Sequence, residues 1–159
     1  MQVNFRVSGR FARPVNEVFE AVADPAQLSS YFTTGGAQGR MEAGKTVMWD
    51  FHDFPGAFPV EVIEVVPNEK IVIEWGANEG DSDAIGAKMA DAGYKTTVTM
   101  LFKALDDGRT LVEIVEEGWR DVPGAVRSAF NNCEGWTGML AAMKVWLEHG
   151  IVLREGFYK

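Results

Sequence analysis

The last third of the chain carries its strongest periodic pattern. Apolar side chains recur there at alternating steps of three and four residues, the spacing of one face of an α-helix. They are Val126, Ala129, Cys133, Trp136, Leu140, Met143 and Leu147. The pattern predicts one helix from about Pro123 to His149, closed by Gly150 as a C-cap. Such a helix would be about 40 Å long, so it needs an apolar surface as wide as a whole sheet to bury its stripe.

The remaining chain has the punctuation of an antiparallel meander. A strand over 3–10 precedes two short helices, one that begins at Pro14 and one over Pro25–Tyr31, with Asp24 as the cap of the second. Glycine and proline turns then separate stretches rich in β-branched and aromatic residues. Six further strands are predicted over 36–41, 46–52, 58–66, 70–76, 95–105 and 109–117, with Pro55-Gly56 and Asp107-Gly108 as two of the turns. The fold class expected is α+β, with seven antiparallel strands in one domain over 1–159.

Segment 77–94 is too long for a tight turn. It predicts a short helix around Ala84–Ala92, and it is the best candidate for a lid.

The charge of the chain argues against nucleic acid as a partner. The net charge is −8 and no run of Lys or Arg occurs, so the basic footprint of a nucleic-acid-binding protein is missing. We find no apolar run of the roughly 20 residues that span a membrane and no signal peptide. With Cys133 as the only cysteine, a cytoplasmic location is expected.

Several segments resemble one family. They are Pro14-Val15-Asn16-Glu17-Val18-Phe19-Glu20-Ala21 with Asp24-Pro25, Val65 to Trp75, Gly108-Arg109-Thr110-Leu111-Val112 with Gly118-Trp119, and Gly135 to Leu140 with Trp146 to Gly150. In this order they resemble the activator of heat-shock-protein-90 ATPase homologue family of the START-like (SRPBCC) superfamily. The resemblance implies a helix-grip fold, like that of Bet v 1, in which a curved sheet wraps around the C-terminal helix. It covers nearly the whole chain, although segment 77–94 looks longer than in short family members.

The resemblance also implies a range of roles, because related domains include lipid carriers, polyketide cyclases and chaperone cofactors. A hydrophobic small molecule, lipid or polyketide-like, is therefore expected as a partner, and a chaperone protein is a further candidate. A homodimer is expected only because homodimers are common.

Glu116 is the candidate polar group of the interior. Alternate residues of a strand face the same side, so Glu116 shares its face with Val112 and Ile114. A buried carboxylate is retained mainly beside a partner, water or ligand. Two alternatives stay open: Glu116 lies half-solvated at the strand end, or it faces a ligand and is the candidate catalytic acid or base.

The aromatic residues suggest the lining of a ligand site. Five tryptophans are many for 159 residues, and indoles give an apolar wall with one donor each; plain core packing is the alternative. The ligand-binding residues predicted are Phe32, Trp49, Phe51, Trp75, Met100, Glu116, Trp119, Trp136, Leu140 and Met143.

Other chemistry is poorly supported. His52 and His149 are far apart in the sequence, and Cys133 lies in no metal-ligand spacing, so no metal or cofactor is expected. His52 is predicted on the outward face of its strand. Three functions stay open: binding of a hydrophobic small molecule, which is favoured, a cyclase or hydrolase that uses Glu116, and a protein interaction that modulates a chaperone ATPase.

Overall fold

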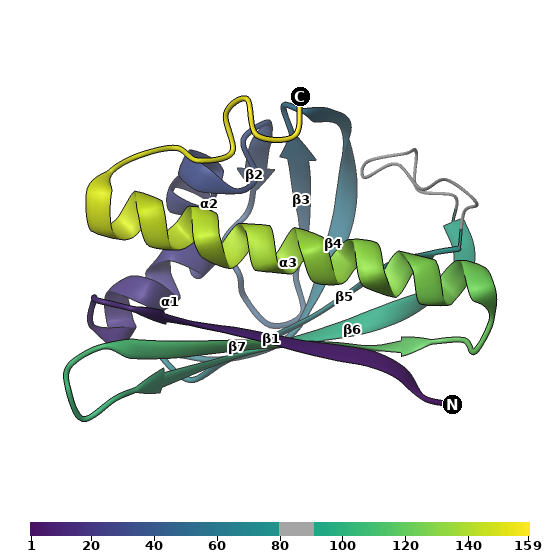
Figure 1. Cartoon of the computed structure of the whole chain (residues 1–159), viewed down its shortest axis with the longest axis horizontal. Helices are drawn as coiled ribbons and strands as arrows, with labels where there is room; N and C mark the ends of the chain where they lie inside the picture. Colours follow the sequence, from purple (N-terminus) through teal and green to yellow (C-terminus); the bar gives the residue numbers. More distant parts are fainter. Residues whose placement is uncertain (80–90) are drawn as a thin grey trace.

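The chain folds into a curved antiparallel sheet that wraps around one long helix (Figure 1). The computed structural model describes residues 1–79 and 91–159. The elements are β1 (Val3–Phe11), α1 (Val15–Ala23), α2 (Pro25–Tyr31), β2 (Gly36–Gln38), β3 (Thr46–Phe51), β4 (Phe54–Val66), β5 (Lys70–Asn78), β6 (Asp91–Ala104), β7 (Thr110–Trp119) and α3 (Pro123–His149). This is the α+β helix-grip architecture predicted from the sequence.

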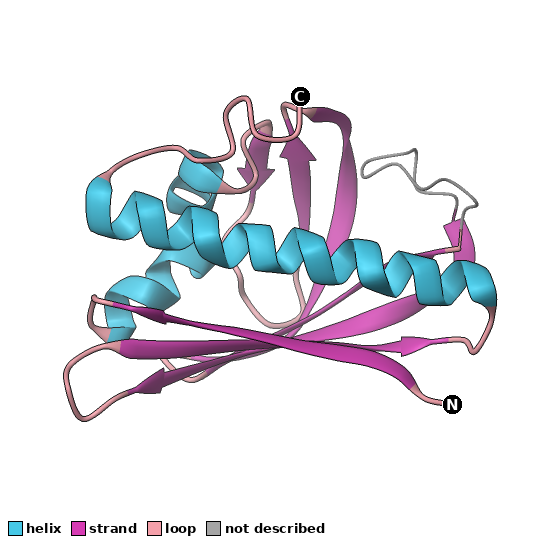
Figure 2. Cartoon of the chain, in the orientation of Figure 1, coloured by secondary structure: helices cyan, strands magenta, loops and turns pink. Residues whose placement is uncertain are grey.

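The sheet has the strand order β1-β7-β6-β5-β4-β3-β2. Every neighbouring pair is antiparallel, and α3 runs across the sheet while α1 and α2 pack near its C-terminal end (Figure 2). The chain after α3 turns back over the end where β2 and β3 lie (Figure 1). The main core therefore lies between α3 and the concave face of the sheet.

The helix ends follow the sequence signals. The Asp24 carboxylate accepts a hydrogen bond from the Ala26 backbone N–H at 2.9 Å and caps α2. Gly150 ends α3 in the left-handed conformation with φ 69°, where glycine has no steric cost. Both predicted caps are confirmed.

The turn predicted at Pro55-Gly56 is wrong. Strand β3 ends at Phe51 and β4 already begins at Phe54, so His52 and Asp53 form the turn and His52 is not on a strand face. The Asp50 carboxylate accepts hydrogen bonds from the backbone N–H of Phe51 and of Gly56, at 2.9 and 3.0 Å. β4 pairs with β5 only from Glu61 onward, and proline is tolerated where one strand edge is free.

Other boundaries shift by a few residues. β2 ends at Gln38 rather than at residue 41, and β7 continues to Trp119. β6 begins at Asp91, so the last two residues of the helix predicted around Ala84–Ala92 lie in a strand. The rest of that helix, and the lid hypothesis with it, falls outside the described residues.

Candidate functional site

Glu116 lies fully buried where α3 crosses the sheet. Its exposed fraction is 0%, so it is not half-solvated at the end of β7. The alternation of β7 places Val112, Ile114 and Glu116 on the buried face, as the strand period predicts. A carboxylate here must find hydrogen-bond partners inside the protein.

Four neutral side chains donate hydrogen bonds to this carboxylate. Trp75 Nε1 on β5 and Thr96 Oγ1 on β6 both donate to Oε1 at 2.8 Å. From α3, Trp136 Nε1 donates to Oε2 at 2.8 Å, and Asn132 Nδ2 lies 3.0 Å from Oε1 and 3.2 Å from Oε2. Three elements besides β7 thus converge on one carboxyl group, and both its oxygens are occupied.

Burial and hydrogen bonding act on Glu116 in opposite directions. Desolvation is the larger effect and raises the pKa of the carboxyl above its usual value, while the bonds from Trp75, Thr96, Trp136 and Asn132 lower it. All its hydrogen-bond partners among residues 1–79 and 91–159 are uncharged. The site therefore holds a buried acid that donors, rather than a cation, stabilise.

Six aromatic rings form a contact network that includes the two indoles bonded to Glu116. We call them the aromatic cluster: Phe32, Trp49, Phe51, Phe58, Trp75 and Trp136. The rings of Trp75 and Trp136, both bonded to Glu116, have centroids 5.3 Å apart. The members come from the end of α2, from β3, β4 and β5, and from α3, so the cluster joins the helices to the sheet.

Trp49 has the central place in the aromatic cluster. Its ring meets those of Phe32, Phe58, Trp75 and Trp136 at centroid distances between 5.8 and 6.5 Å, at angles of 72° to 88°. The residue is 1% exposed, and its indole Nε1 is buried without a hydrogen-bond partner among the described residues.

A buried ion pair closes one end of the aromatic cluster. Arg154, in the segment after α3, donates from Nε and Nη2 to Asp53 Oδ1 at 3.2 and 3.1 Å. Its guanidinium carbon lies 4.4 Å from the ring centroid of Phe51 and 5.6 Å from that of Phe32, within reach of a cation–π interaction. Tyr158 covers the same guanidinium at 4.9 Å. The C-terminal segment is therefore fastened over the cluster.

The structure brings most of the predicted ligand-binding residues together. Phe32, Trp49, Phe51, Trp75 and Trp136 belong to the aromatic cluster, and Met100, Leu140 and Met143 pack in the same core. Trp119 does not: it lies in a separate group with Val3, Ala125 and Ala129. At Gly118, with φ 104°, a bulge leaves one residue unpaired between the pairs Asn4–Glu117 and Val3–Trp119, and it returns Trp119 to the buried face of β7. Because Trp119 lies three residues beyond Glu116, it packs there against the first turns of α3 instead of the aromatic cluster.

Several site residues were missed. Asn132 lies four residues before Trp136 on the predicted helix, and Thr96 shares the strand face of Val98; both could have been found from these spacings. Asp53 and Arg154 carry no local signal, because they are 101 residues apart.

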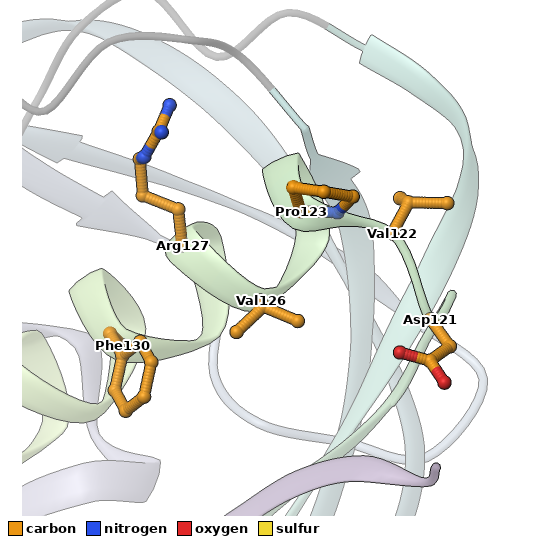
Figure 3. Close-up of a pocket in the computed structure, with 6 residues that line it drawn as sticks. All are labelled: Asp121, Val122, Pro123, Val126, Arg127 and Phe130. Carbon is orange, nitrogen blue, oxygen red and sulfur yellow. The ribbon is translucent and has the colours of Figure 1, made fainter.

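A second feature is an open depression at the start of α3. It has a volume of about 430 Å³ and is lined by Asp121, Val122, Pro123, Val126, Arg127 and Phe130. Figure 3 shows Asp121 and Val122 on the segment before α3 and the other four side chains on the first turns of the helix. Phe130 is 72% exposed, so this surface is apolar and accessible.

Neither a metal-binding cluster nor a membrane-spanning helix occurs in the described part of the chain. No group of three or more His, Cys, Asp or Glu side chains is placed to hold a metal ion. Among helices of residues 1–79 and 91–159, none has the length and apolarity to cross a bilayer.

The family comparison matches most of the chain. A model of the family described as Activator of Hsp90 ATPase homolog 1-like protein matches residues 12–148. Among curated proteins, none is detectably similar in sequence.

Solved structures share the fold. Protein SSP2350 from Staphylococcus saprophyticus is 24% identical, with a TM-score of 0.75 over 96% of each chain. DynU16, from the dynemicin biosynthetic locus, is 24% identical with a TM-score of 0.71 over 92% of this chain and 48% of its own. The Aha1 dimer from Colwellia psychrerythraea is 17% identical with a TM-score of 0.69 over 93% of this chain and 98% of its own.

Proposed function

Because the chain belongs to the Activator of Hsp90 ATPase homolog 1-like family and holds a buried carboxyl group bonded to two members of a six-ring aromatic cluster, we propose that it binds a hydrophobic small molecule between α3 and the sheet. The ligand contacts the aromatic cluster around Glu116. The observation that carries this proposal is the convergence of Trp75, Thr96, Asn132 and Trp136 on Glu116. Ligand sites are mostly apolar with a few polar groups held in place.

The arrangement supports binding better than catalysis. A general acid or base needs an oxygen that can reach the substrate, but both oxygens of Glu116 already accept hydrogen bonds. The four donors are groups that do not exchange a proton near neutral pH. A cyclase or hydrolase that uses Glu116 is therefore the less supported alternative.

Two classes of ligand are proposed for this site. DynU16 belongs to a biosynthetic locus, and this supports flat polyketide-like compounds beside lipids as the classes to test. Flat rings also suit a wall built of Trp49, Trp75 and Trp136.

The test is native mass spectrometry of the purified protein, followed by thermal unfolding with flat polycyclic compounds and fatty acids. A ligand that binds only the folded state at 100 times its Kd stabilises it by about 2.7 kcal/mol. We expect the shift in the wild type to be lost in Trp75→Ala and kept in Trp119→Phe, whose indole lies in a separate group. An adduct or shift that survives Trp75→Ala would contradict the proposal.

A second candidate function is self-association through the depression at the start of α3. One structural neighbour is a dimer in solution, and Val122 and Phe130 present an exposed apolar surface here. Interfaces place such side chains at their centre. We expect sedimentation to give a dimer that Phe130→Ser converts to a monomer. A wild-type monomer over the whole concentration range would contradict self-association and leave the depression to a chaperone, the other protein partner expected from the resemblance.

A further inference from the structure

The indole N–H of Trp49 is a polar group to which the described residues offer no acceptor. Its Nε1 is buried and lacks an acceptor among the described residues, although the whole side chain is only 1% exposed. Leaving a buried donor unpaired costs about 1–3 kcal/mol, so most such groups have a partner in the functional state. Trp75 and Trp136 show the contrast, because each of their indole nitrogens donates to Glu116 at 2.8 Å.

The surroundings of Trp49 explain why its N–H has no acceptor within residues 1–79 and 91–159. Four rings of the aromatic cluster enclose the indole, and all four meet it nearly at right angles. Aromatic carbon offers at most a weak acceptor to an N–H group. A molecule that enters between these rings is therefore the group that can supply an oxygen acceptor.

We infer that Trp49 is a specificity-determining residue, and that its indole N–H selects uncharged, flat aromatic ligands that carry a carbonyl oxygen. This inference rests on the proposed function and names the ligand class of the same site. The preference for a flat aromatic ligand follows from the rings that contact the Trp49 indole, and the carbonyl oxygen follows from its unpaired N–H donor.

The lack of charge follows from Glu116. The two indoles that donate to its carboxyl group, those of Trp75 and Trp136, also contact the Trp49 ring at 6.0 and 6.5 Å between centroids. An anionic ligand head at Trp49 would lie close to a second buried acid, and like charges repel strongly where the dielectric constant is low. Carboxylate ligands such as fatty acids should therefore bind less tightly than neutral ketones.

The experiment compares three probes of one shape: 9-fluorenone, fluorene, which lacks the oxygen, and 9-oxofluorene-2-carboxylate, which adds a charge. Affinities are measured by tryptophan fluorescence titration on the wild type, Trp49→Phe and the control Trp146→Phe, whose ring stacks on Tyr31, outside the aromatic cluster. One hydrogen bond predicts that fluorenone binds about 3- to 10-fold more tightly than fluorene. We expect this preference to vanish in Trp49→Phe and to remain in Trp146→Phe.

The outcomes separate the two proposals. If fluorene and fluorenone bind the wild type equally well, or if Trp49→Phe keeps the preference, the role of Trp49 is wrong while small-molecule binding stands. If the carboxylate binds as tightly as the ketone, the selection for uncharged ligands is wrong. If none of the probes and no fatty acid binds, the proposed function itself fails.

A wild-type measurement guards against misfolding of Trp49→Phe. In ¹⁵N-indole NMR spectra, fluorenone should move the Trp49 N–H proton downfield, as expected for a new hydrogen bond to oxygen, and fluorene should not. Equal shifts with both probes would overturn the inference.

Discussion

Replacing Arg154 with methionine should destabilise the protein through the partner it leaves behind. The side chain of Asp53 is 1% exposed, and its carboxylate is paired with Arg154. Methionine keeps much of the contact with Phe51 but removes the charge. Breaking a buried ion pair by removing one partner costs about 3–5 kcal/mol, because the other charge remains buried and uncompensated.

A double variant separates the charge from the packing. Asp53→Asn combined with Arg154→Met removes both charges, and replacing both members of a buried pair is often close to neutral. Urea unfolding followed by tryptophan fluorescence and circular dichroism gives the free energy of unfolding of each variant. We expect the double variant to regain about 2 kcal/mol or more of the loss seen in Arg154→Met. A loss below about 1 kcal/mol in Arg154→Met, or losses that simply add in the double variant, would show that the pair does not stabilise the fold as a buried ion pair.

Two further predictions concern the helix and the buried acid. Gly124→Ala should destabilise the protein by about 1–3 kcal/mol, because a Cβ there would lie 2.5 Å from the Glu79 carbonyl oxygen. On the same helix, a Cβ at Gly135 meets nothing within 4 Å, so Gly135→Ala should stabilise the protein by about 0.5–1 kcal/mol. Thermal unfolding compares the two variants, and equal effects would contradict the close contact at Gly124. The raised pKa of Glu116 gives the folded state the higher proton affinity, so its stabilising contribution is complete below its ordinary pKa and is lost as pH rises through the raised one. The stability of the wild type relative to Glu116→Gln should therefore decrease as pH rises across that window, and a constant difference would refute the raised pKa.

Part of this fold could be predicted because its signals are local. The apolar stripe on α3 and the cap at Gly150 depend only on residues near one another in the sequence. The two-residue period of a strand was sufficient to predict that Glu116 faces the interior. A bulge at Gly118 breaks that period and turns Trp119 to the buried face, where it packs in a separate group beside the start of α3.

The rest of the site depends on tertiary contacts. The Pro55-Gly56 pair lies inside β4 because the Asp50 carboxylate binds the backbone there. The Asp53–Arg154 pair joins residues 101 positions apart, so no local sequence pattern predicts it. The donors to Glu116 come from two strands and α3, so predicting them requires the inward faces of the strands and of the helix to be considered together.

The most direct test of the account is the ¹⁵N-indole NMR spectrum of the wild type titrated with 9-fluorenone. The five tryptophans give one indole signal each, assigned by single substitution to phenylalanine. Binding at the aromatic cluster predicts shifts of Trp49, Trp75 and Trp136, while Trp119, in its separate group, stays in place. A spectrum in which none of the three moves, or in which only Trp119 moves, would contradict a ligand site between α3 and the sheet.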